Sequence, residues 1–173
     1  MSVKSLLFSI EDSSGTVVAT ATAELLWEQA PKTCAAICSQ LPIETTTFHG
    51  KNSGAEALLV TPACISDVPQ DASESGTTTH AFGNVLFGFE PEGFCVGGAG
   101  STDCSEIAWI YGEAAQACFW VSEDGPPHDK PPYRLQAATL NHFAQIVSED
   151  GFYAASKQLI KTGERRIVVR AGE

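Results

Sequence analysis

The sequence predicts a mainly β protein: a closed, mostly antiparallel β-barrel with one α-helix over each open end. Two observations favour this fold class. About eight or nine short segments have the alternation or the β-branched and aromatic content of strands, whereas only two segments have helical periodicity. The strands are joined mostly by loops, which disfavours a sheet wound with helices on both faces. Closing the sheet also removes the edge strands that so many short strands would otherwise expose.

The first half of the chain is organised around one strand–helix–strand unit. Residues 19–25 alternate apolar and polar side chains, which is the period of a half-buried strand. Pro31 suits the first position of a helix, where no backbone N–H is needed, and apolar side chains one turn apart extend this helix over residues 31–41, until Pro42 ends it. We also predict strands at residues 5–10, 45–48, 57–60 and 85–89, a turn at 13–16 and a long polar loop at 62–82.

The second half predicts a hairpin and a second helix. Residues 107–111 and 117–121 have strand character and are expected to pair around a turn at Gly112 and Glu113. Apolar side chains at helical spacing predict a helix over residues 152–162, and Gly163 suits the position after it. The remaining segments are predicted as a glycine-rich loop at 91–105, a proline-rich loop at 123–132 and strands at 140–147 and 166–170.

Length and composition predict a single domain that covers residues 1–173. The formal net charge of -11 argues against nucleic acid or an anionic membrane as a partner, because both attract basic surfaces. The N-terminal residues lack the pattern of a signal peptide, so a cytoplasmic location is expected. The cysteines show no Cys-x-x-Cys pair, and Cys34 and Cys38 lie on the apolar stripe of the first helix, where we expect core packing.

Four short segments resemble a bacterial family of uncharacterised cyclophilin-like proteins. In that family an Ala-Pro-Lys-Thr-Cys helix start is followed by a His-x-basic-x-Ser-Gly segment, a Glu-Ile-Ala…Tyr-Gly strand and an Asn-x-Phe-Ala strand. The corresponding residues here are 30–34, 49–54, 106–112 and 141–144, within a likeness that spans about residues 17–170. The resemblance implies a cyclophilin-like barrel of about eight strands capped by two helices, and it implies no established activity.

Peptidyl-prolyl cis-trans isomerase activity is the alternative that the wider cyclophilin resemblance suggests. Cyclophilins carry an arginine directly after a Phe-His pair, where its guanidinium donates hydrogen bonds to the twisting amide. In this chain Phe48 and His49 are followed by Gly50, which has no side chain to donate. Lys51 comes one residue later and would point to the opposite face of a regular strand. We therefore expect the chain to lack isomerase activity.

A small-ligand site is the function that the same segment favours. If the strand continues past Phe48, then His49, Lys51 and Ser53 share one face and could bind a small polar or anionic molecule, with Lys51 as the charge. Glu106, Tyr111 and Asn141 lie at the ends of predicted strands and could border the same surface. The alternative for this segment is a solvated lysine, a histidine bonded to a loop carbonyl and a simple turn.

Other chemistry receives little support from the sequence. His80, His128 and His142 lack metal-binding spacing, so neither a metal nor another cofactor is expected. The glycine-rich stretch at Gly97 and Gly98 lacks the Lys-Ser/Thr of a phosphate-binding loop, and Trp109, Trp120 and Tyr111 are expected to pack within the barrel. A structural or interaction subunit, including a homo-oligomer, remains a third class of function.

Overall fold

The computed structural model describes residues 3–51, 53–92, 102–124 and 131–172. The predictions for the glycines around Gly97, for residues 125–130 of the proline-rich loop and for His128 fall outside these residues. The main sheet has nine strands in the described residues, of which the short β5 (Gly76–Thr77) only pairs with the start of β10. The other eight are β1 (Ser5–Glu11), β2 (Val17–Leu25), β3 (Ile43–His49), β4 (Gly54–Val60), β6 (Asn84–Glu90), β7 (Cys104–Ala115), β10 (Leu140–Asp150) and β11 (Arg165–Ala171).

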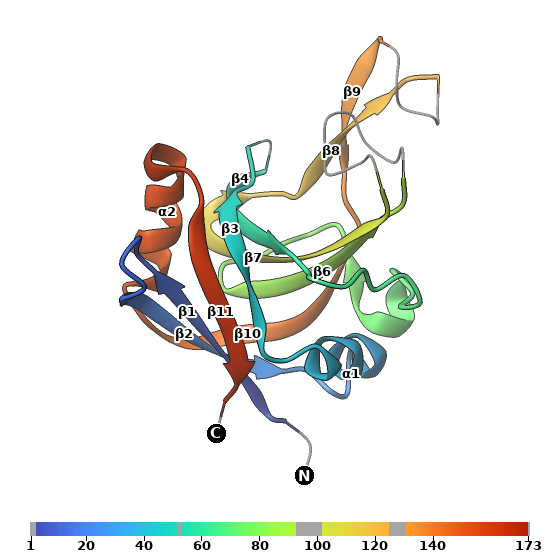
Figure 1. Cartoon of the computed structure of the whole chain (residues 1–173). Helices are drawn as coiled ribbons and strands as arrows, with labels where there is room; N and C mark the ends of the chain where they lie inside the picture. Colours follow the sequence, from blue (N-terminus) through green and yellow to red (C-terminus); the bar gives the residue numbers. More distant parts are fainter. Residues whose placement is uncertain (1–2, 52, 93–101, 125–130, 173) are drawn as a thin grey trace.

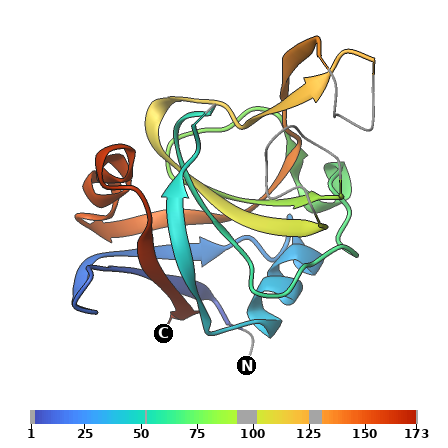
Figure 2. The same ribbon diagram turned by 45° about the horizontal axis from the view of Figure 1, so that its top comes forward.

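These strands form a closed antiparallel barrel, as the sequence predicts. Their order around the barrel is β2, β1, β11, β3, β4, β7, β6 and β10, and β10 pairs in turn with β2. Figure 2 shows the strands curving around a common interior. The closing pair sets Ala144 opposite Leu25 and Asp150 opposite Thr20. No strand among these eight therefore presents an unpaired edge along its whole length.

Two helices lie on opposite sides of the barrel, α1 (Pro31–Ser39) and α2 (Phe152–Thr162) (Figures 1 and 2). Each follows its prediction, although α1 ends two residues before the predicted Leu41, because a residue before a proline avoids helical dihedral angles. Phe152 of α2 is fully buried and packs against Phe8 and Trp109, with ring centroids 5.9 and 5.2 Å away. Both helices therefore cover the same core.

The alternation of side chains fills the barrel interior with apolar groups. Leu6 and Phe8 of β1 and Ile107 and Trp109 of β7 point inward and are buried. The outer face of β6 and β7 is also covered, by a second apolar cluster that the connections before β8 and β10 complete. This second cluster consists of Leu86, Ala108, Ile110, Ala117, Ala138 and Leu140. The barrel wall at β6 and β7 is therefore buried on both faces.

The predicted hairpin between residues 107–111 and 117–121 is wrong. Strand β7 already pairs with β4 on one edge and β6 on the other, so no edge is left for the next strand. Instead β8 (Cys118–Ser122) pairs with β9 (Tyr133–Ala137), a strand that the sequence did not predict. This hairpin projects from the barrel (Figure 1), and Trp120 lies on it rather than within the barrel, opposite Leu135 and 38% exposed.

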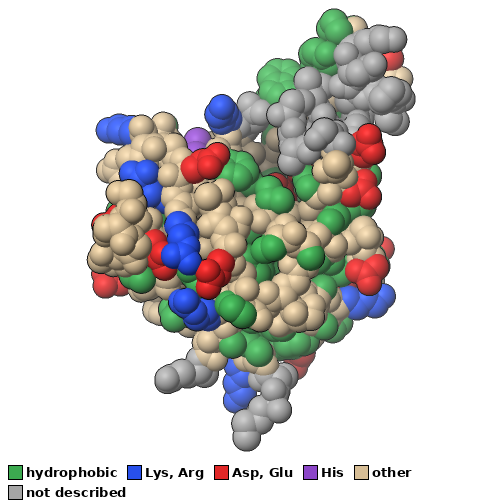
Figure 3. Space-filling model, viewed as in Figure 1, with side chains coloured by type: hydrophobic (Ala, Val, Ile, Leu, Met, Phe, Trp, Pro, Cys, Tyr) green, Lys and Arg blue, Asp and Glu red, His purple; other side chains and the backbone are tan. Residues whose placement is uncertain are grey.

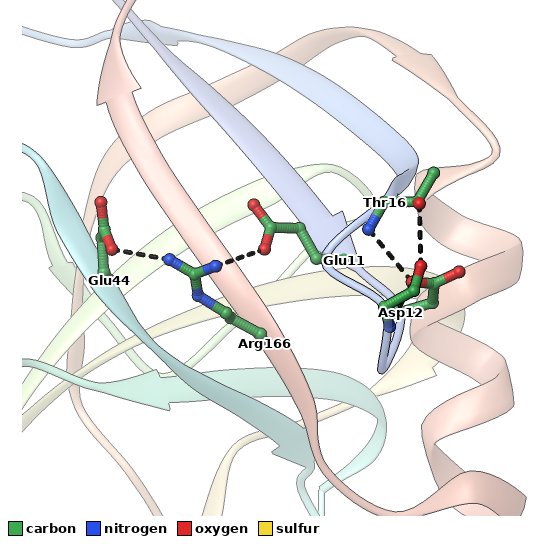
Figure 4. Close-up of polar contacts among 6 residues, drawn as sticks. Glu11, Asp12, Thr16, Glu44 and Arg166 are labelled. Atoms are coloured by element: carbon green, nitrogen blue, oxygen red, sulfur yellow. Dashed lines mark hydrogen bonds and ion pairs between the residues drawn. The ribbon is translucent and has the colours of Figure 1, made fainter.

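Polar contacts fix the strand ends near the first turn. Arg166 of β11 donates to Glu11 of β1 and to Glu44 of β3, both at 2.7 Å, and so links three neighbouring strands (Figure 4). The backbone N–H groups of Ser14 and Thr16 donate to the Asp12 carboxylate, which forms the predicted turn. Because the Arg166 side chain is half exposed, we expect its ion pairs to add little to the free energy of unfolding.

On the face shown in Figure 3, basic and acidic side chains are interspersed, with hydrophobic side chains between them. In the described part of the chain, no helix has both the length and the apolar character that crossing a membrane requires.

A buried glutamate from a distant loop caps helix α1. The residue before the helix, Ala30, has no side chain to accept a hydrogen bond. Glu74, in the short 3-10 helix η1 (Ala72–Glu74), accepts instead from the backbone N–H of Lys32 at 3.2 Å and of Thr33 at 2.9 Å. The Thr33 hydroxyl also donates to it, at 3.0 Å. The loop predicted at 62–82 thus supplies the negative charge that the helix start favours.

Replacing this cap should destabilise the protein. Glu74→Ala leaves buried backbone donors of α1 without an acceptor, so we expect the free energy of unfolding to fall by about 2 kcal/mol. Urea denaturation followed by circular dichroism measures the change. Glu28→Ala, at an exposed position, is the matched control and should change stability by less than about 0.5 kcal/mol. Equal effects of the two substitutions would contradict the capping role.

Candidate functional site

Three glutamates share the outer face of neighbouring strands. Alternation turns Ile107 and Trp109 of β7 inward, so Glu106 points outward. Glu106 pairs with Gly88 of β6, and Glu90, two residues further along β6, therefore lies on the same outer face. On β4 the inward residues are Ala57 and Leu59, which places Glu56 outside as well. The sheet thus brings together three carboxyl groups that are far apart in the sequence.

All three carboxyl side chains are largely withdrawn from water. Glu56 is 2% exposed, Glu90 6% and Glu106 7%. Burial is the main cause that raises the pKa of Glu56 to about 7, with a smaller contribution from the charge of Glu90. Burial, followed by the charges of Glu90 and Glu56, raises the pKa of Glu106 well above its usual range. Burial and the neighbouring charges therefore both disfavour the ionised form of Glu56 and Glu106.

A glycine makes room for the Glu56 carboxyl group. A Cβ atom at Gly50 would lie 2.9 Å from Oε2 of Glu56, so this carboxyl group occupies space that a side chain at position 50 would need. At Gly88 the close neighbour is Leu140, whose Cδ2 would lie 2.6 Å from a Cβ atom, and Oε1 of Glu106 would lie at an ordinary contact distance of 3.4 Å. Cyclophilins have an arginine at the position that corresponds to Gly50. Here the space beside Gly50 is occupied by the carboxyl group of Glu56.

His49 stands at the end of β3 and is held from the barrel interior. Its Nδ1 atom is hydrogen-bonded to the Tyr111 hydroxyl at 2.9 Å. The Tyr111 ring belongs to the core, whereas His49 is half-buried and borders the cleft. Burial raises the pKa of the Tyr111 hydroxyl, with a further contribution from the charge of Glu56. Tyr111 therefore orients the imidazole from behind.

Ser53 is committed to the framework around Glu56. The strand β3 ends at His49, and the backbone N–H of Ser53 donates to the carbonyl of Gly50 in a turn. The Ser53 hydroxyl accepts from the backbone N–H of Cys118 at 3.3 Å and hydrogen-bonds to the Glu56 carboxyl, which opposes the rise of its pKa. The strand does not run on past His49, because the backbone turns at Gly50, so the condition for one shared strand face of His49, Lys51 and Ser53 is not met.

The carboxyl groups and His49 line one cleft of about 810 Å³. The cleft extends from the end of α2 across β3 and β4 to the β8 hairpin. Exposed Lys51 stands at the turn, and it is the only lysine or arginine among the described residues that line the cleft. The apolar part of the wall comes from Phe48, Leu58, Val60, Phe119, Trp120, Leu159 and Ile160. The site thus combines an apolar wall with buried acids.

The structure brings together five of the six residues predicted for the site. His49, Lys51, Ser53 and Glu106 line the cleft, and Tyr111 contacts His49 from the interior. The sixth lies elsewhere and is described below.

Asn141 lies near the start of α1, away from the cleft. Its Nδ2 donates to the hydroxyl of Thr33 at 3.1 Å and to the carbonyl of Pro69 at 2.8 Å, and it is fully buried. It therefore supports the Glu74 cap of the helix, since Thr33 also donates to Glu74. Asn141 is not among the described residues that line the cleft.

Sequence reasoning missed Glu56 and Glu90. Each interrupts or ends a run of apolar residues in a strand, and an acid in such a run is a signal of a buried polar site. Only the pairing of β4 and β6 with β7 shows that both belong with Glu106. Within the described residues, no group of three or more His, Cys, Asp or Glu side chains is arranged to hold a metal ion.

The fold and the cleft define a closed β-barrel protein with a ligand-sized, acidic cleft on its outer wall. A family described as "Protein of unknown function (DUF3830)" matches residues 13–119, which is more than half of the chain. The chain belongs to this family. No match was found among curated proteins.

Two solved structures are similar to the chain in fold. The hypothetical protein AF2241 from Archaeoglobus fulgidus, a solution structure, is 19% identical with a TM-score of 0.51, and the alignment covers 99% of this chain and 98% of that one. McbB, solved in complex with tryptophan, is 16% identical with a TM-score of 0.57, over 97% of this chain but only 45% of McbB. Identities this low support a common fold alone.

The buried acids should make the protein less stable as pH rises. The folded state holds the pKa of Glu56 at about 7, above the value of 4.5 expected when unfolded, so the folded state binds more protons and its stability falls between these pH values. Glu56→Gln should remove this loss, which amounts to about 3 kcal/mol. Urea denaturation gives the free energy of unfolding of the variant and of the parent at about pH 4.5 and about pH 8. We expect the difference, variant minus parent, to be more positive at the higher pH. A difference that does not change with pH would contradict the burial of an ionisable Glu56.

Proposed function

We propose that the chain binds a small polar molecule in the cleft on the outer wall of its barrel. The observation that carries this proposal is the burial of Glu56 and Glu106 in the wall of a cleft. Withdrawing a carboxyl group from water has a free-energy cost, and a site that gains a ligand there can offset it. A volume of about 810 Å³ is enough for a metabolite-sized molecule.

The charges of the wall favour hydrogen-bond donors over an anionic group on the ligand. Among the described lining residues, four are glutamates, Glu56, Glu90, Glu106 and Glu164, and one is a lysine. An anionic group on the ligand would raise the pKa of the buried acids further. A hydrogen-bond donor on the ligand could instead donate to their carboxyl oxygens. The small polar molecule expected from the sequence is therefore retained, and its anionic variant is disfavoured.

The apolar wall restricts the ligand further. Phe48, Leu58 and Phe119 offer surface to an apolar body that accompanies the polar group. McbB, which shares the fold, was solved with tryptophan, a molecule that has both parts. We therefore include amino acids and their amines in the panel of candidate ligands.

A cyclophilin-like fold without isomerase activity is the second part of the proposal. No arginine occurs among the described residues that line the cleft, and the position after His49 is a glycine beside the Glu56 carboxyl. A carboxyl group accepts hydrogen bonds or donates one when protonated, and it does not present the fork of donors that a guanidinium offers. Peptide-bond rotation therefore has no evident electrophilic assistance at this site.

Ligand binding should be visible as a thermal shift that depends on His49. A panel of amino acids, amines and other polar metabolites should contain at least one compound that raises the melting temperature of the parent, because a ligand that binds only the folded state stabilises it. His49→Ala removes a polar group of the cleft and should abolish the shift. Lys157→Ala, an exposed residue of α2 outside the cleft, is the control and should keep it. A shift that survives His49→Ala would place the ligand elsewhere.

The isomerase alternative predicts a different result. A proline-containing peptide should show the same rate of cis–trans exchange with and without the protein, as measured by NMR exchange spectroscopy. The physical reason is the lack of a guanidinium next to His49. Acceleration proportional to protein concentration, lost in His49→Ala, would overturn this part of the proposal.

A further inference from the structure

The cleft offers one buried acid whose charged neighbours are other acids. Glu106 is 7% exposed, and its side chain lines the cleft, where the charges around it are those of Glu90 and Glu56. Both charges oppose its ionisation. A carboxyl group that ionises away from water loses hydration, and neighbouring negative charges add to this cost. A positively charged donor from outside would lower the cost.

The surroundings of Glu106 show which kind of donor fits. Its partner across the sheet is Gly88, and the space that a side chain at Gly88 would take is occupied by Leu140 beside Glu106. Val60, its partner on β4, and Leu58 extend an apolar wall beside it. Lys51 is the only cation among the described lining residues and is exposed at the turn. The site is thus acidic at one point and apolar around it.

We propose, on the basis of the proposed function, that the ligand is an organic cation whose ammonium group is bound by Glu106 and whose apolar body lies against Leu58 and Val60. An ammonium group has three N–H donors and no acceptor, so it complements several carboxyl oxygens at once. Its charge also offsets the mutual repulsion of Glu106, Glu90 and Glu56.

A metal ion is a less suitable occupant than an organic cation. Metal ions such as Ca²⁺ take six or more oxygen ligands at short distances. The described residues contain no group of three or more His, Cys, Asp or Glu side chains in such an arrangement. The apolar wall would add nothing to metal binding, whereas it buries the hydrocarbon part of an amine.

Three probes with nearly the same shape and different charge test this proposal. We would measure the affinities of 2-phenylethylamine, 2-phenylethanol and 3-phenylpropionate by isothermal titration calorimetry. The amine should bind at least about tenfold more tightly than the alcohol, since a charge-assisted hydrogen bond is stronger than a neutral one, and the carboxylate should bind most weakly.

Matched variants show whether Glu106 is responsible. Glu106→Gln keeps the shape but cannot carry a negative charge, and it should remove the tenfold advantage of the amine while leaving the alcohol unaffected. Glu24→Gln makes the same chemical change at an exposed position on β2 and should alter no affinity. Lys51→Ala should not weaken the amine. Urea denaturation of each variant at the same pH shows that it is folded.

The outcomes separate this inference from the proposed function. An amine affinity that is unchanged in Glu106→Gln, or a carboxylate that binds as tightly as the amine, overturns the assignment of an organic cation. If the alcohol or the carboxylate binds more tightly than the amine, and His49→Ala abolishes that binding, the cleft binds a neutral or anionic ligand. The proposed function then holds, and the organic cation is overturned. If none of the three probes binds, the cationic assignment fails, and the thermal-shift panel decides the proposed function independently.

Discussion

The antiparallel pairing of β10 with β2 is the constraint on which the structure depends. It closes the sheet, so every inward side chain must fit the same small interior, and Phe8, Trp109 and Phe152 fill that space. A filled interior leaves no room for a ligand. Any binding site must therefore form on the outside of the wall or at its ends, and the cleft lies on the outer face of β4 and beside the end of α2.

The same constraint explains why three acids meet on the outer wall of the barrel. Side chains alternate along each strand, so residues that follow or precede inward ones point outward without exception along a regular strand. Glu56, Glu90 and Glu106 obey this rule, and they line a cleft whose wall also includes Ala117, Cys118 and Phe119 beside β8.

This arrangement places stability and binding in opposition. Burial raises the pKa of Glu56 and Glu106, and the folded state becomes less favourable as pH rises. A protein under selection for stability alone would replace these side chains by apolar ones, because well-packed apolar residues are often more stable than buried charges. By contrast, Glu74 is buried with three donors and serves the fold. Glu74 thus accepts three hydrogen bonds from the start of α1, whereas Glu106 lies beside the charges of Glu90 and Glu56.

The sequence by itself determined the barrel, both helices, the first turn and the cluster around His49, because periodicity, proline positions and turn residues are local signals. The sequence also placed Glu106 in the site, without showing which other carboxyl groups lie beside it, and it assigned Asn141 to the same site. Only the tertiary structure decided that Glu56 and Glu90 join Glu106, that β8 pairs with β9 and that Asn141 supports α1. The physical reason is that strand order and register join residues distant in the chain, and no local pattern carries that information.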